Sequence, residues 1–169
     1  AKLYLSELPE GDNRVNLAGY LAQNMSKDEP KEALLWARSL GDEASVERAS
    51  QTAISSWAAQ DPQAVVAFLQ TTGGEKELTE YAGTIANNWA RQNVQSAAGW
   101  ALGLEGEARE QAVEQVSREW LEHNTEEASI WIAELEAGPA RDGAVRNLVN
   151  QVYRSDPEAA FAWATTMES

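Results

Sequence analysis

The feature that most constrains this chain is a pair of large side chains that recurs at a nearly constant interval. The residue number of the second member increases by 32, 32, 32, 31 and 32 along the series Tyr4, Trp36, Phe68, Trp100, Trp131 and Trp163. That of the first member increases by 32, 32, 31 and 33 along Met25, Trp57, Trp89, Trp120 and Tyr153. All seven tryptophans occupy these two slots. A fixed period of this length is typical of a repeat protein.

The stretch from Ser56 to Phe68 indicates what one repeat is. Trp57 closes one apolar helical face, and Asp61-Pro62 then provides a start signal for a second helix. The carboxylate accepts free N–H groups of the first turn, and proline suits the first helical position. Val65, Phe68, Leu69 and Thr72 follow at the spacing of one helical face. The repeat is therefore predicted to be a helical hairpin with a turn of about three residues.

The other copies carry related signals. Start signals recur at Glu29-Pro30, Asn93-Val94, Asn124-Thr125 and Asp156-Pro157. Asn124, with Glu127 three residues later, is typical of a capping box. A glycine follows each internal second helix, where a left-handed residue closes a helix at least cost, at Gly11, Gly41, Gly73, Gly106 and Gly138. Four residues before the first slot, an apolar face of the first helices is predicted at Leu21, Ala53, Ile85, Val116 and Val149.

These signals predict an all-α fold, a solenoid of tandem helical hairpins with about 11 helices in one domain over residues 1–169. We expect a partial repeat at 1–9 and five hairpins at 12–40, 43–71, 75–104, 107–136 and 141–167. A hairpin of two short helices cannot bury its apolar faces alone, so each hairpin should stack on its neighbour. The chain begins in the middle of a unit, which favours a fragment of a longer array.

The two slots are predicted to be structural, because a large flat side chain fills the gap where three or four helices meet. Small neighbours such as Ala58, Ala90 and Ala101 would let the backbones approach. A ligand cage built from the same rings is the alternative. The predicted core residues are Trp36, Trp57, Phe68, Trp89, Trp100, Trp120, Trp131 and Trp163.

Composition excludes several classes of function. A formal charge of −14 argues against nucleic acid and against anionic membrane surfaces as partners. No apolar run approaches the length of a membrane span, and the first residues carry no signal-peptide pattern. Zero cysteines exclude disulfides, zinc ribbons and thiol catalysis. The compartment stays open, with cytoplasmic and periplasmic or extracellular locations both allowed.

Nothing in the sequence indicates catalysis, a cofactor or a metal site. His123 is the only histidine, so no paired-His site can form within the chain. Acidic pairs such as Glu126-Glu127 and Asp42-Glu43 stand near predicted helix starts, where the helix dipole explains them. No phosphate-binding glycine loop, nucleophile motif or metal-ligand cluster is present. We therefore expect a protein that is not an enzyme.

The repeat pattern resembles that of the tetratricopeptide-like folds, right-handed spirals of stacked helical hairpins that mostly bind peptides and hold complexes together. The resemblance covers the whole chain and rests on the pattern Trp-Ala-x-x-Asp-Pro-x-Ala, which is fullest from Trp57 to Ala64. The family's usual period is slightly longer, and its Trp-Leu-Gly-Tyr and Ala-Phe-Ala patterns are not reproduced. Similar arrays look like those of long bacterial proteins. The resemblance implies the right-handed superhelix and a concave face lined by the first helices.

Polar, mostly uncharged residues stand just before the first slot on the first helices. Asn and Gln each offer a donor and an acceptor, which match the backbone of an extended peptide, and arginine binds carboxylates bidentately. By the resemblance, these residues would form the floor of a groove; a solvated or tightly packed helix face is the alternative. The candidate binding residues are Asn24, Gln51, Asn87, Asn88, Arg118, Asn147, Asn150 and Gln151.

We therefore expect a protein–protein interaction scaffold that holds an extended segment of a protein or peptide partner on its concave face. The alternative function is structural. In that case the array is a spacer or rod within a larger protein and self-associates through its open solenoid ends.

Overall fold

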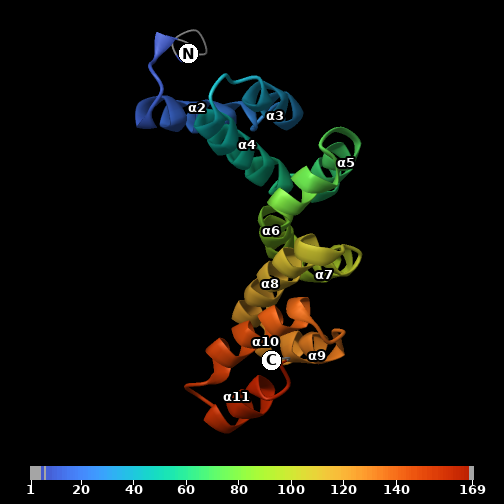
Figure 1. Ribbon diagram of the computed structural model, residues 1–169. Coiled ribbons are helices and arrows are strands. Elements are labelled where there is room, and N and C mark those ends of the chain that lie inside the picture. Colours follow the sequence, from blue (N-terminus) through green and yellow to red (C-terminus); the bar gives the residue numbers. More distant parts are fainter. Residues whose placement is uncertain (1–4, 6, 168–169) are drawn as a thin grey trace. The chain divides into compact units, whose positions relative to one another are not determined.

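The computed structural model describes residue 5 and residues 7–167, and within these residues it contains ten helices and no strand (Figure 1). The predicted all-α class is thus confirmed for the described part of the chain. The partial repeat predicted at residues 1–9 lies mostly outside it. By its internal contacts the chain divides into two compact units, residues 1–74 and 75–169. Each unit is described by itself.

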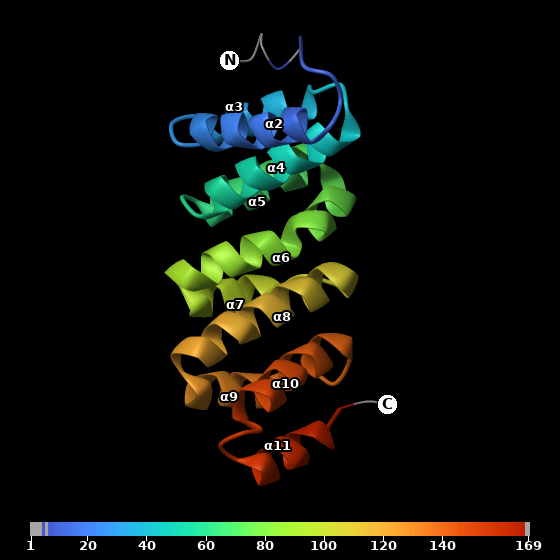
Figure 2. The ribbon, with the colours of Figure 1, turned by 90° about the vertical axis from the view of Figure 1, so that its left-hand side faces the viewer.

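The described part of the first unit contains four helices, two in or near each of the ranges predicted as the first two hairpins. Helix α2 packs against α3 and α4, and α4 also packs against α3 and α5 (Figures 1 and 2). Part of the core is formed by Leu5, Ala18, Leu21, Ala22, Ala37 and Ala49. The helices are α2 (Asp12–Met25), α3 (Pro30–Arg38), α4 (Glu43–Ala58) and α5 (Pro62–Thr72).

In the second unit, the residues that the structure describes form six helices, two in or near each of the other three predicted ranges. Helix α8 packs against α7, α9 and α10, and α10 also packs against α9 and α11 (Figure 2). Helix α6 begins at the last residue of the first unit. The helices are α6 (Gly74–Gln92), α7 (Val94–Leu102), α8 (Gly106–His123), α9 (Thr125–Glu134), α10 (Pro139–Val152) and α11 (Pro157–Ala164).

Helix starts follow the capping signals in most hairpins. At five helices, an Asp or Asn side chain accepts a hydrogen bond from the backbone N–H three residues later, which satisfies a donor that the helix leaves free. Glu29 makes no such side-chain bond, and α3 begins with Pro30 alone as its signal. The five capping residues are Asp42, Asp61, Asn93, Asn124 and Asp156.

Of the five glycines predicted in the left-handed region, Gly11, Gly106 and Gly138 have a positive φ, but they stand at the start of the next helix rather than closing the preceding one. Gly41 and Gly73 do not have a positive φ, and Gly74 has one instead. Gly11 and Gly138, with φ of 142° and 140°, are the N-caps of α2 and α10. The links between hairpins are short. The positive φ therefore serves mainly to set the direction in which the next helix begins. Glycine adopts this conformation most easily.

The two slots meet inside each of three hairpins. The ring centroids of Trp57 and Phe68 lie 5.3 Å apart, those of Trp89 and Trp100 5.6 Å, and those of Trp120 and Trp131 5.4 Å, all in tilted arrangements that suit aromatic pairs. Each pair therefore joins the two helices of one hairpin. Among the predicted core residues, four are buried, Trp57, Trp89, Trp120 and Trp131, and four are half-buried, Trp36, Phe68, Trp100 and Trp163.

The register predicted for the fifth hairpin is shifted by one residue. Leu148 is buried where Val149 was expected, and Val149 is half-buried. Tyr153, the C-cap of α10, is 46% exposed and does not occupy the first slot. Val152 precedes Trp163 by the same interval that separates Trp120 from Trp131. The first slot of this hairpin is therefore Val152, which restores the interval of 32 residues from Trp120.

An arginine near the start of three first helices contacts the segment that follows a second helix. Arg14, Arg109 and Arg141 stand at one register of the repeat, because each precedes a second-slot residue by the same interval. Arg109 Nη2 lies 3.6 Å from Glu136 Oε2. Arg141 donates to the carbonyl oxygen of Thr166 at 3.0 Å. These contacts tie each first helix to the chain segment after the second helix of its own hairpin.

The contact of Arg14 is the most buried of the three. Its Nε lies 2.7 Å from Asp42 Oδ2, and the two side chains are only 16% and 10% exposed. Burial raises the pKa of Asp42, but hydrogen bonding by Ser45 and the charge of Arg14 lower it by more, so this pKa lies below its ordinary value of 3.8. The charged form of Asp42 therefore stabilises the first unit.

Replacing a buried slot residue should cost far more stability than replacing an exposed aromatic residue. We expect Trp120→Ala, at a side chain 8% exposed, to lower the free energy of unfolding by about 3–5 kcal/mol. Phe161→Ala, at a side chain 73% exposed, should change it by less than about 0.5 kcal/mol. Urea denaturation followed by circular dichroism measures both. Equal losses would contradict the structural role of the slot.

Acid should remove the stabilisation by Asp42. Because its pKa is lowered on folding, the contribution is fully present above the ordinary pKa and is lost as pH falls through the lower folded value. We expect Asp42→Asn to cost about 1–3 kcal/mol at neutral pH, and the difference from the unmodified protein to shrink below about pH 3.8. Urea denaturation at several pH values tests this. A difference that grows on acidification would refute it.

Candidate functional site

A hollow of about 320 Å³ lies between α8 and α10 in the second unit. Four of the eight predicted binding residues line it: Arg118 from α8, and Asn147, Asn150 and Gln151 from α10. Leu121 and Glu122 complete the lining. Half of the predicted binding residues thus lie together at one place in the second unit, and we take this hollow as the candidate functional site.

Helical periodicity explains why these six residues face one another. Arg118, Leu121 and Glu122 follow the i, i+3, i+4 spacing of one helix face, and Asn147, Asn150 and Gln151 follow the same spacing. Helices α8 and α10 pack together. A Cβ atom at Gly143 would lie 3.9 Å from Glu114 Cβ, an ordinary van der Waals distance, so α10 is in direct contact with α8 at this point. The polar stripes of the two helices consequently border one hollow.

Arg118 is already paired within its own helix. Its Nη2 donates to Glu114 Oε1 at 2.9 Å, and its Nη1 donates to Gln115 Oε1 at 3.4 Å. The positive charge is therefore largely neutralised. A carboxylate from a partner, which the sequence suggested for this residue, would have to displace Glu114.

Asn147 is also engaged. Its Nδ2 donates to the carbonyl oxygen of Glu114 at 3.0 Å and to Ser117 Oγ at 2.9 Å. Ser117 is fully buried, and its hydroxyl donates to the same carbonyl oxygen of Glu114. Asn147 thus links α10 to α8, and its amide group helps to build the hollow.

The other three polar side chains are open to a ligand. Asn150, Gln151 and Glu122 are exposed. Within the described residues, none of their side chains forms a hydrogen bond or an ion pair. Together they offer two amides, each with donors and an acceptor, and one carboxylate. Leu121, which is 3% exposed, adds an apolar contribution to the lining.

The other predicted binding residues lie elsewhere. Asn24 and Gln51 belong to the first unit, and Asn87 and Asn88 lie on α6. Asn24 donates to the carbonyl oxygen of Tyr20 at 2.9 Å, and Asn88 to that of Thr84 at 2.9 Å. Both bonds lie within one helix, as expected for the alternative of a solvated or tightly packed helix face. The structure does not bring these four residues to the hollow.

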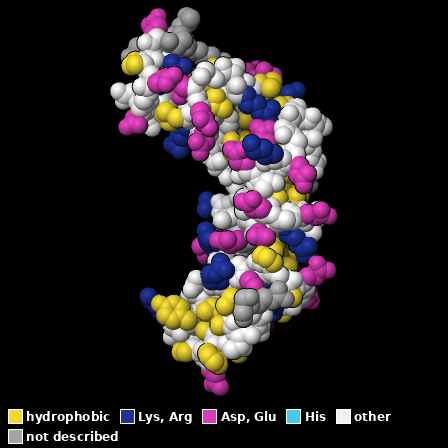
Figure 3. Space-filling view, in the orientation of Figure 1, with side chains coloured by type: hydrophobic (Ala, Val, Ile, Leu, Met, Phe, Trp, Pro, Cys, Tyr) yellow, Lys and Arg dark blue, Asp and Glu magenta, His cyan; other side chains and the backbone are white. Residues whose placement is uncertain are grey.

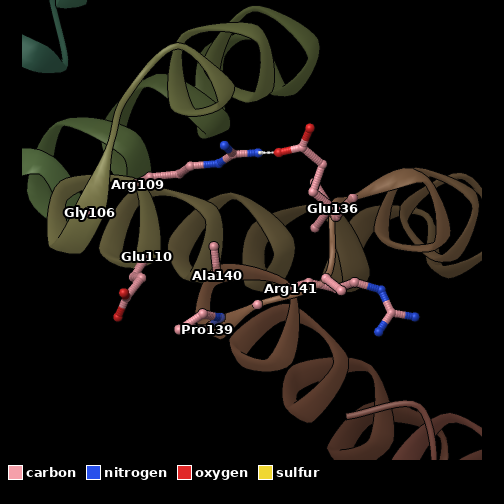
Figure 4. Close-up of a pocket in the computed structure, with 10 residues that line it drawn as sticks. Gly106, Arg109, Glu110, Glu136, Pro139, Ala140 and Arg141 are labelled. Carbon is pink, nitrogen blue, oxygen red and sulfur yellow. Dashed lines mark ion pairs between the residues drawn. The ribbon is translucent and has the colours of Figure 1, made fainter. Parts of the chain in front are cut away.

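A second hollow, of about 210 Å³, lies among α8, the link after α9 and the start of α10 (Figure 4). Arg109 and Glu136 point toward each other across it, whereas Glu110 and Arg141 point away (Figure 4). Its charged groups do not converge on a common point. Sequence reasoning missed this place, although the recurrence of Arg14, Arg109 and Arg141 at one register was a usable signal.

Sequence reasoning also missed Glu122 and Leu121. Their spacing of three and four residues from Arg118 could have found them. Within the described ranges, no group of three or more His, Cys, Asp or Glu residues is placed to hold a metal ion. The same part of the chain contains no helix that is both long and apolar enough to cross a membrane. The Nδ1 atom of His123 lies 2.8 Å from the carbonyl oxygen of Glu119 in its own helix.

Comparisons with known proteins add no relative. A scan against protein-family models and searches of curated proteins and of solved structures found no match. The functional argument therefore rests on the residues of the hollow.

Replacing Asn147 should destabilise the protein much more than replacing Asn150. We expect Asn147→Ala to lower the free energy of unfolding by about 1–3 kcal/mol, because it removes two hydrogen bonds between α10 and α8. Asn150→Ala, at an exposed side chain, should change it by less than about 0.5 kcal/mol. Urea denaturation of both variants measures the difference. A large loss in the Asn150 variant would contradict its assignment as an open group.

Proposed function

We propose that this chain is a non-enzymatic scaffold that binds an extended segment of a partner protein in the hollow between α8 and α10. The observation that carries this proposal is the pair of exposed amides at Asn150 and Gln151, which border the hollow and form no hydrogen bond with the described residues. An extended backbone presents N–H and C=O groups in alternation. Side-chain amides match both, because each has donors and an acceptor.

The construction of the hollow supports this function. Asn147 and Ser117 hold α10 against α8 by hydrogen bonds, so the open amides stand on rigid helices. Binding then orders few protein groups, which lowers the entropic cost of association. The volume of about 320 Å³ suits a few residues of an extended segment rather than a large folded surface.

The arrangement of hairpins supports a wider proposal about the architecture. We propose that the tandem hairpins form a right-handed solenoid of the tetratricopeptide-like kind. Helices α8 and α10 are first helices of their hairpins, so this architecture would put the hollow on the concave face. Peptide binding on that face is what the resemblance implies for a scaffold.

Self-stacking as a rod is a second candidate function, and one observation favours it. Phe161 is 73% exposed and Tyr153 is 46% exposed, and hydrophobic side chains gather on this end of the second unit (Figure 3). Leu34 stands at the register of Phe161, two residues before the second slot, and is fully buried in the first unit, where α3 packs against α4. A second copy of the chain would cover the exposed rings in the same way.

Selection from a displayed library of random peptides tests the scaffold function. We expect the unmodified chain to enrich a set of sequences, and the double variant Asn150→Ala, Gln151→Ala to bind them about tenfold more weakly, because two hydrogen bonds are lost. Gln95→Ala, at an exposed side chain of α7 outside the hollow, is the matched control.

Enrichment that the double variant retains in full would refute binding in this hollow. No enrichment, together with a mass in light scattering that grows with concentration, would favour the rod.

A further inference from the structure

The hollow between α8 and α10 carries one charge that the protein does not neutralise. Two charged side chains line it, Arg118 and Glu122. Arg118 is held by Glu114 at 2.9 Å. Glu122 is exposed and forms no ion pair within the described residues. The site therefore presents a free carboxylate beside two free amides.

The charges around the hollow do not cancel this carboxylate. Glu119 forms an ion pair with Arg91, in which Arg91 Nε lies 3.3 Å from Glu119 Oε2. Arg154 lies over the ring of Tyr153 and donates to its hydroxyl oxygen at 2.6 Å. Arg146 stands one turn before Asn150 on α10 but does not line the hollow.

The net charge of the second unit is also negative, like the charge of Glu122. Residues 75–169 contain seven Lys and Arg against seventeen Asp and Glu, a net charge of −10. A field of this sign raises the local concentration of cationic segments and repels anionic ones.

We infer that the partner segment bound in this hollow carries a lysine or arginine side chain that pairs with Glu122. This inference rests on the proposed scaffold function and names the chemistry of its partner. The side chains of Asn150 and Gln151 hold the backbone of the segment. The aliphatic part of the basic side chain lies toward Leu121, and its charged end reaches Glu122, as long basic side chains commonly place themselves.

The opposite partner chemistry is less favourable. An acidic segment would need Arg118, and Arg118 would first have to leave Glu114. It would also approach a unit of net charge −10 and the free carboxylate of Glu122. A basic segment breaks no existing ion pair.

The experiment uses the displayed random peptide library against the full chain, followed by titration of a labelled enriched peptide. We expect enriched sequences to share a lysine or arginine at one fixed position. Glu122→Gln should weaken binding of the labelled peptide about two- to fivefold, as for a solvent-accessible ion pair. Glu110→Gln is the matched control, because it makes the same change of net charge on the same helix outside the hollow.

Charge reversal sharpens the test. Glu122→Lys should bind the original peptide more weakly still, and should prefer a peptide in which the shared basic residue is replaced by glutamate. Circular dichroism of each variant verifies that the helices are intact.

The outcomes separate this inference from the function on which it rests. Peptides that need Asn150 and Gln151, but share no basic residue or bind the Glu122→Gln variant equally well, would overturn the inference and leave the scaffold standing. Enrichment of acidic peptides that Arg118→Gln no longer binds would also overturn it. No enrichment by the unmodified chain would overturn both proposals.

Discussion

Most of this structure depends on the contact between two aromatic rings inside a hairpin. With centroids 5.3–5.6 Å apart, the rings of three hairpins join a first helix to a second helix. The rings leave the rest of each hairpin's apolar surface uncovered, and a neighbouring helix must bury it. Within the first unit α4 packs against α3, and within the second unit α8 packs against α7 and α10 against α9. Short links between the hairpins of one unit follow, because each hairpin packs directly on its neighbour.

The packing of neighbouring hairpins also produces the candidate site. When α10 packs on α8, the apolar faces meet and the adjacent polar stripes are left facing each other across a hollow. Some of the polar groups then serve the packing itself. Asn147 bonds to Ser117 and to the backbone of α8, and Arg118 is held by Glu114. The polar side chains of Asn150, Gln151 and Glu122 take no part in this packing and are available to a partner. Function in such a hollow is set by the groups that the packing does not use.

The arginine that recurs at one register of the repeat makes a contact of different strength in each of three hairpins. Arg14 meets Asp42 at 2.7 Å in a nearly buried pair. Arg109 meets Glu136 at 3.6 Å, and the side chain of Glu136 is 84% exposed, so water screens that pair. Arg141 donates instead to the hydroxyl and carbonyl oxygens of Thr166. In all three hairpins the arginine contacts the segment after the second helix, but the group that it contacts differs.

The sequence by itself determined the helical class, the period and most helix starts. These depend on local chemistry: Asp61-Pro62 or Asn124 caps a helix through a bond to a residue three positions away. Local patterns also located Asn147, Asn150 and Gln151 on one face of one helix. Only the tertiary structure decided that Leu148 and not Val149 is buried, that Tyr153 lies outside the slot, and that Arg118 is neutralised while Glu122 is free. These outcomes depend on which neighbouring helix approaches and at which register. Burial and charge pairing are properties of contacts between segments, and spacing along one chain does not specify them.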